Sequence, residues 1–299
     1  MPLPIPAPRE SGFTTSTETP LYWVAYGPAE ADKLLVLHGG PGADHAYLLP
    51  QMLHLAEKHN LILYDQRGGG KSKSDEHEPV TIDTHVADLD AIVKELDLSN
   101  PSIVAYSFGA MIALYYCLEA ERNPSFSKPS RMALIDPAPL RMDFRKQFEA
   151  EFSRRQNGPE VKAMRDELAA SGLREEDPTE YKQRAFELAV AGYFADPRSA
   201  RNLTPFRITG RVQESVWASI GTDYDLLGKL SPMDFPVLIV HGRDDPIPAT
   251  SSVDGAKAMN AQLVLLDACG HVPYVEQPGP LFSALDGFLS TSDSSATRT

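Results

Sequence analysis

Three side chains of the types that catalyse acyl transfer are spread along this sequence of 299 residues: Ser107, Asp245 and His271. A serine hydroxyl attacks a carbonyl carbon when a histidine takes its proton and a carboxylate orients that histidine. Each side chain follows an apolar run that predicts a buried strand: residues 103–106, 236–240 and 262–266. The carboxyl ends of parallel strands meet at one edge of a sheet, where the order serine, acid, histidine is expected. The sequence therefore predicts a catalytic triad of these three residues.

The serine lies in a segment that is typical of a sharp turn between a strand and a helix. Residues 105–109 read Ala-Tyr-Ser-Phe-Gly, and helix-forming residues follow as far as Glu121. Small side chains near the serine allow the two backbones to approach, and the turn presents the hydroxyl at the edge of the sheet. A serine in this place could also be a simple helix N-cap. The order of the three groups along the chain favours the nucleophile.

Two other aspartates compete with Asp245 for the role of the acid. Asp244 is its neighbour, and Asp136 also follows a predicted strand. We favour Asp245 because it lies three residues after Gly242 and Pro248 stiffens the far side of the loop, although an aspartate before a proline also initiates turns. Among the histidines, we interpret His241 as structural because it ends a strand before a glycine.

The tetrahedral intermediate of acyl transfer needs two backbone N–H groups that point at its oxyanion. Residues 38–42 read His-Gly-Gly-Pro-Gly and follow an apolar strand at residues 34–37. Glycine lets a backbone approach a ligand closely, and this loop lacks the lysine and hydroxyl of a phosphate-binding loop. We expect the N–H groups of Gly40 and Phe108 to form the oxyanion hole.

Apolar strands alternate with amphipathic helices over most of the chain. This pattern predicts an α/β fold with a mostly parallel sheet that is covered by helices. Leucine and methionine at helical spacing predict one helix over residues 43–59. A second helix is predicted over residues 81–98, with Thr81 as its cap.

The middle of the chain has a different character. Residues 137–234 contain no run of strands and predict helices broken before four prolines: Pro159, Pro178, Pro197 and Pro205. We expect residues 1–136 and 235–290 to form the catalytic domain, with residues 137–234 inserted as a helical lid or cap at the edge where such sheets bind ligands. Residues 291–299 are rich in serine and threonine and predict a disordered tail.

The composition argues against several classes of function. The formal net charge is −13 and the isoelectric point is about 5.0, which disfavours a nucleic-acid or anionic-membrane partner. No segment approaches the roughly 20 apolar residues of a membrane span, so we expect a cytoplasmic protein. The two cysteines, Cys117 and Cys269, provide neither a disulfide framework nor the spacing of metal ligands. We therefore predict an enzyme without metal or cofactor, and the sequence leaves its oligomeric state open.

These motifs resemble those of the α/β-hydrolases and, more narrowly, those of the proline iminopeptidase family. The most specific are residues 38–42 and the loop at residues 65–72, which reads Asp-Gln-Arg-Gly-Gly-Gly-Lys-Ser. Members of that family usually carry glycine where this chain has Ala105 and tryptophan where it has Phe108. The resemblance implies an α/β-hydrolase fold with an inserted helical lid.

The resemblance also implies a role for each site residue: Ser107 as nucleophile, His271 as base, Asp245 as acid, and Gly40 and Phe108 as oxyanion donors. In proline iminopeptidases, glutamates of the lid hold the free amine of the substrate. Glu187 and Glu214 are candidates for that contact, and both also fit as solvated charges on helices. Tyr106, beside the serine, is a third candidate for binding substrate.

We therefore expect a serine hydrolase that cleaves an N-terminal aminoacyl amide or peptide bond through an acyl-enzyme, as a proline iminopeptidase-like aminopeptidase or amino-acid amidase. Its partner would be a small molecule or a short peptide. The alternative is a carboxylesterase or lactonase that acts on small esters, because a triad serves esters and amides alike. A binding protein of the same fold without turnover is a third possibility. It is disfavoured because all three members of the triad are present.

Overall fold

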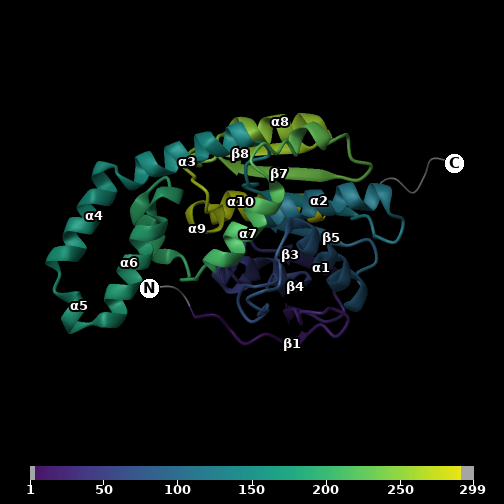
Figure 1. Ribbon diagram of the computed structural model, residues 1–299, viewed down its shortest axis with the longest axis horizontal. Helices are drawn as coiled ribbons and strands as arrows, with labels where there is room; N and C mark the ends of the chain where they lie inside the picture. The colour runs from purple at the N-terminus through teal and green to yellow at the C-terminus, as the bar shows by residue number, and fades with distance from the viewer. Residues whose placement is uncertain (1–3, 291–299) are drawn as a thin grey trace.

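Eight strands form one sheet in the computed structural model, which describes residues 4–290 (Figure 1). The strands are β1 Glu10–Phe13, β2 Tyr22–Tyr26, β3 Lys33–Leu37, β4 Asn60–Tyr64, β5 Ser102–Tyr106, β6 Arg131–Ile135, β7 Val237–Gly242 and β8 Gln262–Leu266. Their order across the sheet is β1-β2-β4-β3-β5-β6-β7-β8. Neighbouring strands from β4 to β8 run parallel, whereas β2 pairs antiparallel with both β1 and β4 at one edge of the sheet. The predicted mostly parallel sheet is confirmed.

Helices cover both faces of the sheet because its central strands are apolar on both sides. Alternate residues of β3 belong to different apolar clusters: Leu35 and Leu37 pack with α1 and α2, whereas Leu34 and Val36 pack on the opposite face. Helices α1 Ile82–Glu95, α2 Phe108–Arg122 and α8 Ala249–Met259 contribute to the first cluster, and α10 Pro278–Leu289 contributes to the second. The predicted cap of α1 is present, since Thr81 accepts a hydrogen bond from the N–H of Thr84 (3.1 Å).

The prediction of a single helix over residues 43–59 is wrong. The segment forms two 3₁₀ helices, His45–Leu48 and Gln51–Glu57, with Pro50 between them. Proline has no N–H to donate and its ring collides with the preceding turn, so one helix cannot run through this position. The apolar face was correctly predicted, because Leu48, Leu49 and Met52 are fully buried.

A helical insertion, defined as the segment between β6 and β7, lies beyond the carboxyl ends of the strands. It contains α3 Met142–Gln156, α4 Pro159–Ala170, α5 Leu173–Glu176, α6 Pro178–Val190 and α7 Gly210–Ile220, with three short 3₁₀ helices. Prolines begin α4 and α6, so the predicted breaks before Pro159 and Pro178 are confirmed. Figure 1 shows α4, α5 and α6 extending beyond the sheet. Helix α7 returns to the N-terminus of α1, where the N–H of Ile82 donates to Ser219 Oγ (3.0 Å).

Within residues 4–290, no helix is both long and apolar enough to cross a membrane. The tail predicted to be disordered, residues 291–299, lies outside the described residues.

Candidate active site

Ser107 lies on a sharp turn between β5 and α2. Its backbone has φ 53° and ψ −117°, a conformation that is uncommon for a residue with a side chain. The turn is held from below, since the N–H of Ser107 donates to the carbonyl of Ile135 at 2.9 Å. Crowding around Ser107 explains why positions 39 and 109 are glycines. A Cβ added at Gly109 would lie 2.5 Å from the carbonyl oxygen of His38, and one added at Gly39 would lie 2.7 Å from Ser107 Cβ. The turn therefore fixes the hydroxyl at the sheet edge.

The three predicted catalytic side chains form one chain of hydrogen bonds. Ser107 Oγ lies 2.9 Å from His271 Nε2, and His271 Nδ1 lies 2.7 Å from Asp245 Oδ2. The other oxygen of Asp245 accepts the N–H of Ile247 (2.7 Å), which fixes the carboxylate. Because Nδ1 faces a carboxylate, it carries the ring proton, and Nε2 accepts the hydroxyl proton. Burial lowers the pKa of His271 to about 4, so the imidazole is neutral at neutral pH.

The structure separates the three candidate acids. Asp244 is exposed, although it is adjacent to Asp245 in the chain. Asp136 is fully buried behind the triad, and its Oδ1 accepts the N–H of Gly242 at 2.8 Å. A carboxylate oxygen of Asp136, one of Asp245 and a ring nitrogen of His241 lie within 4.8 Å of one another, which is close enough to share a metal ion. Asp245 is the acid that contacts His271.

The predicted oxyanion donors, Gly40 and Phe108, line a cavity together with Ser107. Phe108 is the first residue of α2, so its N–H has no acceptor within the helix. Gly40 has φ +59° and lines the cavities around Ser107. The N-terminus of α2 adds a partial positive charge at the same point. Both predicted donors therefore line the same cavity as Ser107.

Two cavities of different chemistry meet at Ser107 and His271. One, of about 520 Å³, has a mixed lining in which the helical insertion supplies four charged or polar side chains, Arg145, Glu149, Gln213 and Glu214, beside the aromatic rings of Phe148 and Trp217. The other, of about 300 Å³, has aromatic and aliphatic walls: Tyr47, Tyr106, Phe152, Phe186, Phe206 and Tyr274. We call them the polar cavity and the apolar cavity. Two chemically different portions of one substrate can therefore extend from the reacting carbonyl.

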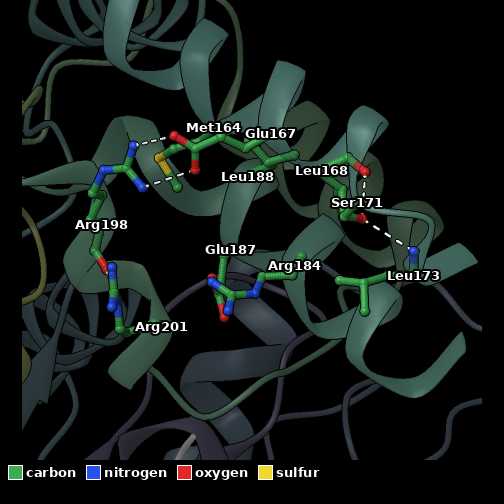
Figure 2. Close-up of a pocket in the computed structure, with 10 residues that line it drawn as sticks. All are labelled: Met164, Glu167, Leu168, Ser171, Leu173, Arg184, Glu187, Leu188, Arg198 and Arg201. Carbon is green, nitrogen blue, oxygen red and sulfur yellow. Dashed lines mark hydrogen bonds and ion pairs between the residues drawn. The ribbon is translucent and has the colours of Figure 1, made fainter. Parts of the chain in front are cut away.

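The three predicted substrate contacts have different surroundings. Glu214 lines the polar cavity, and Tyr106 lines the apolar cavity while its hydroxyl donates to the carbonyl of His271 (2.8 Å). Glu187 lies in neither, because α6 turns Phe186 and Val190 towards Ser107 and Glu187 away. Glu187 lines a separate pocket of about 220 Å³. Figure 2 shows it there with three arginines: Arg184, Arg198 and Arg201. The structure thus brings Glu214 and Tyr106, and not Glu187, to the serine.

Two residues that sequence reasoning missed hold the histidine loop against the helical insertion. The carbonyl of Tyr193 accepts the N–H of His271 (2.7 Å), and the two rings lie 5.3 Å apart at 30°. Glu276 accepts N–H groups from Ala195 (2.8 Å) and Asp196 (3.3 Å) through one oxygen, and from Gly270 (2.8 Å) through the other. No motif marks either residue, because both contacts depend on how the insertion docks.

Comparisons with known proteins identify the family of this chain. Residues 34–284 match the profile of the Alpha/beta hydrolase family. A proline iminopeptidase from Thermoplasma volcanium is 28% identical over 266 residues, which cover 84% of this chain and 86% of that protein.

Solved structures give the same fold. A proline iminopeptidase-related protein from Thermus thermophilus superposes with a TM-score of 0.70 at 23% identity, covering 94% of this chain and 96% of that one. The 2-hydroxy-6-oxo-6-phenylhexa-2,4-dienoate hydrolase from a Rhodococcus species superposes with a TM-score of 0.67 at 21% identity, covering 94% and 99%. The extent of the profile match, over a sheet of the expected topology, places this chain in the alpha/beta hydrolase family.

Proposed function

We propose that this protein is a serine hydrolase that works through an acyl-enzyme. The observation that carries the proposal is the unbroken contact from Ser107 through His271 to Asp245. His271 takes the hydroxyl proton as Ser107 attacks a carbonyl carbon, and it then gives that proton to the leaving group. Water enters, loses a proton to His271 and attacks the acyl-enzyme, which releases the acid and restores the serine. Asp245 holds the tautomer and stabilises the imidazolium.

The N–H groups of Gly40 and Phe108 stabilise the oxyanion in both halves of this cycle. The carbonyl oxygen gains its negative charge between the two donors, beside the N-terminus of α2. A fixed donor of this kind contributes about 2.7–4 kcal/mol to the transition state in serine hydrolases. The helical insertion acts as the cap that encloses this reaction, since it supplies walls of both cavities.

We propose a short peptide or an aminoacyl amide with a free amine as the substrate. Arg145 pairs with Glu149 (2.8 Å) and its guanidinium lies 3.8 Å above the ring of Trp217, so these two charges are already matched. Glu214 makes no ion pair within residues 4–290, which leaves its carboxylate available for an ammonium group. Relatives named proline iminopeptidases support the same substrate class.

The apolar cavity favours a second candidate, an esterase or lactonase that binds an uncharged substrate there. Hydrolysis of a panel of aminoacyl arylamides, dipeptides and short acyl esters by the purified protein separates the two. We expect the highest kcat/KM with substrates that carry a free amine, and a lower value for the same compounds after N-acetylation. A preference for esters that is indifferent to the amine would reject the aminopeptidase in favour of the esterase.

Serine catalysis is tested separately from specificity. We expect a fluorophosphonate to label the wild-type protein and Ser107→Ala neither to be labelled nor to turn over substrate above about one part in a million of the wild-type kcat. Circular dichroism of the variant provides the control for folding. Wild-type turnover by a folded Ser107→Ala protein would rule out the acyl-enzyme.

A further inference from the structure

Asp136 is a buried carboxyl group that the catalytic cycle above does not use. It follows β6 with φ 41° and is fully buried. Its Oδ1 accepts the N–H of Gly242 (2.8 Å), whereas its Oδ2 is equally buried and has no hydrogen-bond partner within residues 4–290. A charged carboxylate oxygen in such a place has neither water nor a donor to stabilise it.

The histidine beside Asp136 brings no positive charge. His241 Nε2 lies 3.1 Å from the carbonyl of Ile247, which can only accept, so Nε2 carries the ring proton. Nδ1 then carries no proton and accepts a hydrogen bond from the hydroxyl of Ser252 (3.0 Å). It lies 3.5 Å from Asp136 Oδ1. Burial also lowers the pKa of His241 to about 4. The imidazole is therefore neutral and does not offset the charge of either aspartate.

The remaining titratable groups around the two aspartates are uncharged, anionic or already paired. Those nearby are Tyr106 of β5, Tyr193 of the helical insertion, Cys269 and His271 of the loop after β8, Tyr274 and Glu276 of α9 Pro273–Glu276, and Arg155 of α3. Burial raises the pKa of the three phenols and of the thiol, so all four stay protonated. Arg155 is paired with Glu151 at 2.7 Å. Two carboxylates at this point would repel each other without a cation between them.

The hydrogen bonds decide which of the two acids keeps a proton. Asp245 accepts N–H groups from His271 (2.7 Å) and Ile247 (2.7 Å), one on each oxygen, and these donors stabilise its charged form. Asp136 Oδ2 has no such donor within the described residues. Burial raises the pKa of both carboxyl groups, that of Asp245 to about 8 and that of Asp136 well above its ordinary value. The difference in hydrogen-bond donors therefore assigns the proton to Asp136.

We propose that Asp136 is a neutral carboxylic acid whose Oδ2–H is donated to Asp245, so that the two acids present a single negative charge to His271. The proposal rests on the triad described under the proposed function. Asp136 is then a positioning residue. It acts through Asp245 by fixing the orientation of the carboxylate and by sharing its charge, and its proton is not consumed in the cycle.

Infrared spectroscopy can detect the proton on the Asp136 carboxyl group without any measurement of catalysis. The C=O stretch of a protonated carboxylic acid is separate from the carboxylate bands. We expect it in the wild-type protein at neutral pH, and we expect it to be lost in Asp136→Asn and retained in Asp244→Asn, the exposed neighbour of the acid. A wild-type spectrum without this band would overturn the proposal. So would elemental analysis that finds a stoichiometric divalent cation lost from Asp136→Asn, because a metal would then occupy the place of the proton.

Kinetics test the positioning role. An asparagine at position 136 can still donate to Asp245 and accept from Gly242, so we expect Asp136→Asn to keep kcat and the acid limb of the kcat/KM profile. Asp136→Leu has no donor, and we expect its kcat to fall about tenfold to a hundredfold with KM retained. If Asp136 were ionised, its replacement by asparagine would remove a charge and lower the pKa of His271, and the acid limb would move to lower pH.

The measurements distinguish failure of the proposal about Asp136 from failure of the proposed function. A shifted acid limb in Asp136→Asn, or wild-type kcat in a folded Asp136→Leu, would overturn the proposal. If Asp136→Leu does not fold, the asparagine variant and the infrared band decide. If the wild-type protein hydrolyses none of the panel, the proposed function fails while the infrared measurement still judges the proton on Asp136.

Discussion

At the scale of single residues, the burial of His271 sets the pH range in which a hydroxyl proton can be accepted. The ring is a base only while Nε2 is free, and burial lowers its pKa from 6.5 to about 4. As the pH falls through that pKa the ring becomes charged and the base is lost. We therefore expect kcat/KM to stay on its plateau well below pH 6.5 and to fall only near pH 4 to 5, in a profile measured with a substrate that does not titrate there. An acid limb centred at or above the ordinary histidine pKa would contradict this.

The two glutamates predicted to bind substrate form a matched pair for a second test. Glu214 lines the polar cavity beside Ser107, whereas Glu187 faces the pocket in Figure 2. We expect Glu214→Gln to raise KM for a substrate with a free amine by roughly fivefold, the loss of about 1 kcal/mol from a partly solvated ion pair. Glu187→Gln should leave KM unchanged. Equal effects of the two substitutions, or none on the amine-bearing substrate, would remove Glu214 from the proposed binding site.

Residues whose position follows from their own strand could be predicted from the sequence, and residues positioned by another segment could not. Ser107, Asp245 and His271 each follow an apolar strand, and parallel strands bring their carboxyl ends together whatever the details of packing. Tyr193 and Glu276 contribute through the docking of the helical insertion on the histidine loop. That docking is long-range and leaves no period or motif in the sequence.

At the scale of elements, local chemistry explains both the successes and the failure. Proline at the start of α4 and α6 marks a helix boundary, because its missing N–H has no partner there in any case. At Pro50 the same residue lies within an apolar pattern of helical spacing, and the spacing alone predicted one helix where there are two 3₁₀ segments. The chemistry of proline outweighs the periodicity of the surrounding leucines.

Glu276 is the element-scale link between the helical insertion and the catalytic loop. Glutamine would keep one acceptor oxygen and place an amide N–H₂ against the other N–H donors, so Glu276→Gln must lose either Gly270 or the pair Ala195 and Asp196. A hydrogen bond to a charged group is worth about 1.5–3 kcal/mol. We expect faster amide hydrogen exchange in residues 193–196 and a kcat lowered by about tenfold, because His271 is less well oriented.

The exposed carboxyl group of Glu57 supplies the control for this substitution. Glu57→Gln should change neither the exchange rates nor kcat. Unchanged exchange in Glu276→Gln would show that the insertion is held by other contacts.

At the scale of the whole molecule, one buried ion network joins three segments far apart in the sequence. Arg67, in the loop after β4, contacts Asp88 of α1 at 2.6 and 2.9 Å, Glu78, and Thr19 near the start of β2 (3.1 Å). Asp88 is 1% exposed, so it has little access to water if its partner is removed. We expect Arg67→Met to lower the free energy of unfolding by about 3–5 kcal/mol, measured by denaturant titration.

The matching surface pair is Arg243 and Asp267, whose side chains are 55% and 87% exposed. We expect Arg243→Met to change the free energy of unfolding by about 0–1 kcal/mol. Similar losses in the two variants would mean that burial of the Arg67 network does not determine its contribution.

The contacts that Tyr193 and Glu276 make between the histidine loop and the helical insertion bear on the stage of folding at which the serine can become reactive. An incompletely folded chain contains Ser107, but the contacts of Tyr193 and Glu276 with the histidine loop form only when the helical insertion docks. If the proposed mechanism holds, we therefore expect such a chain to lack an oriented base and to hydrolyse little.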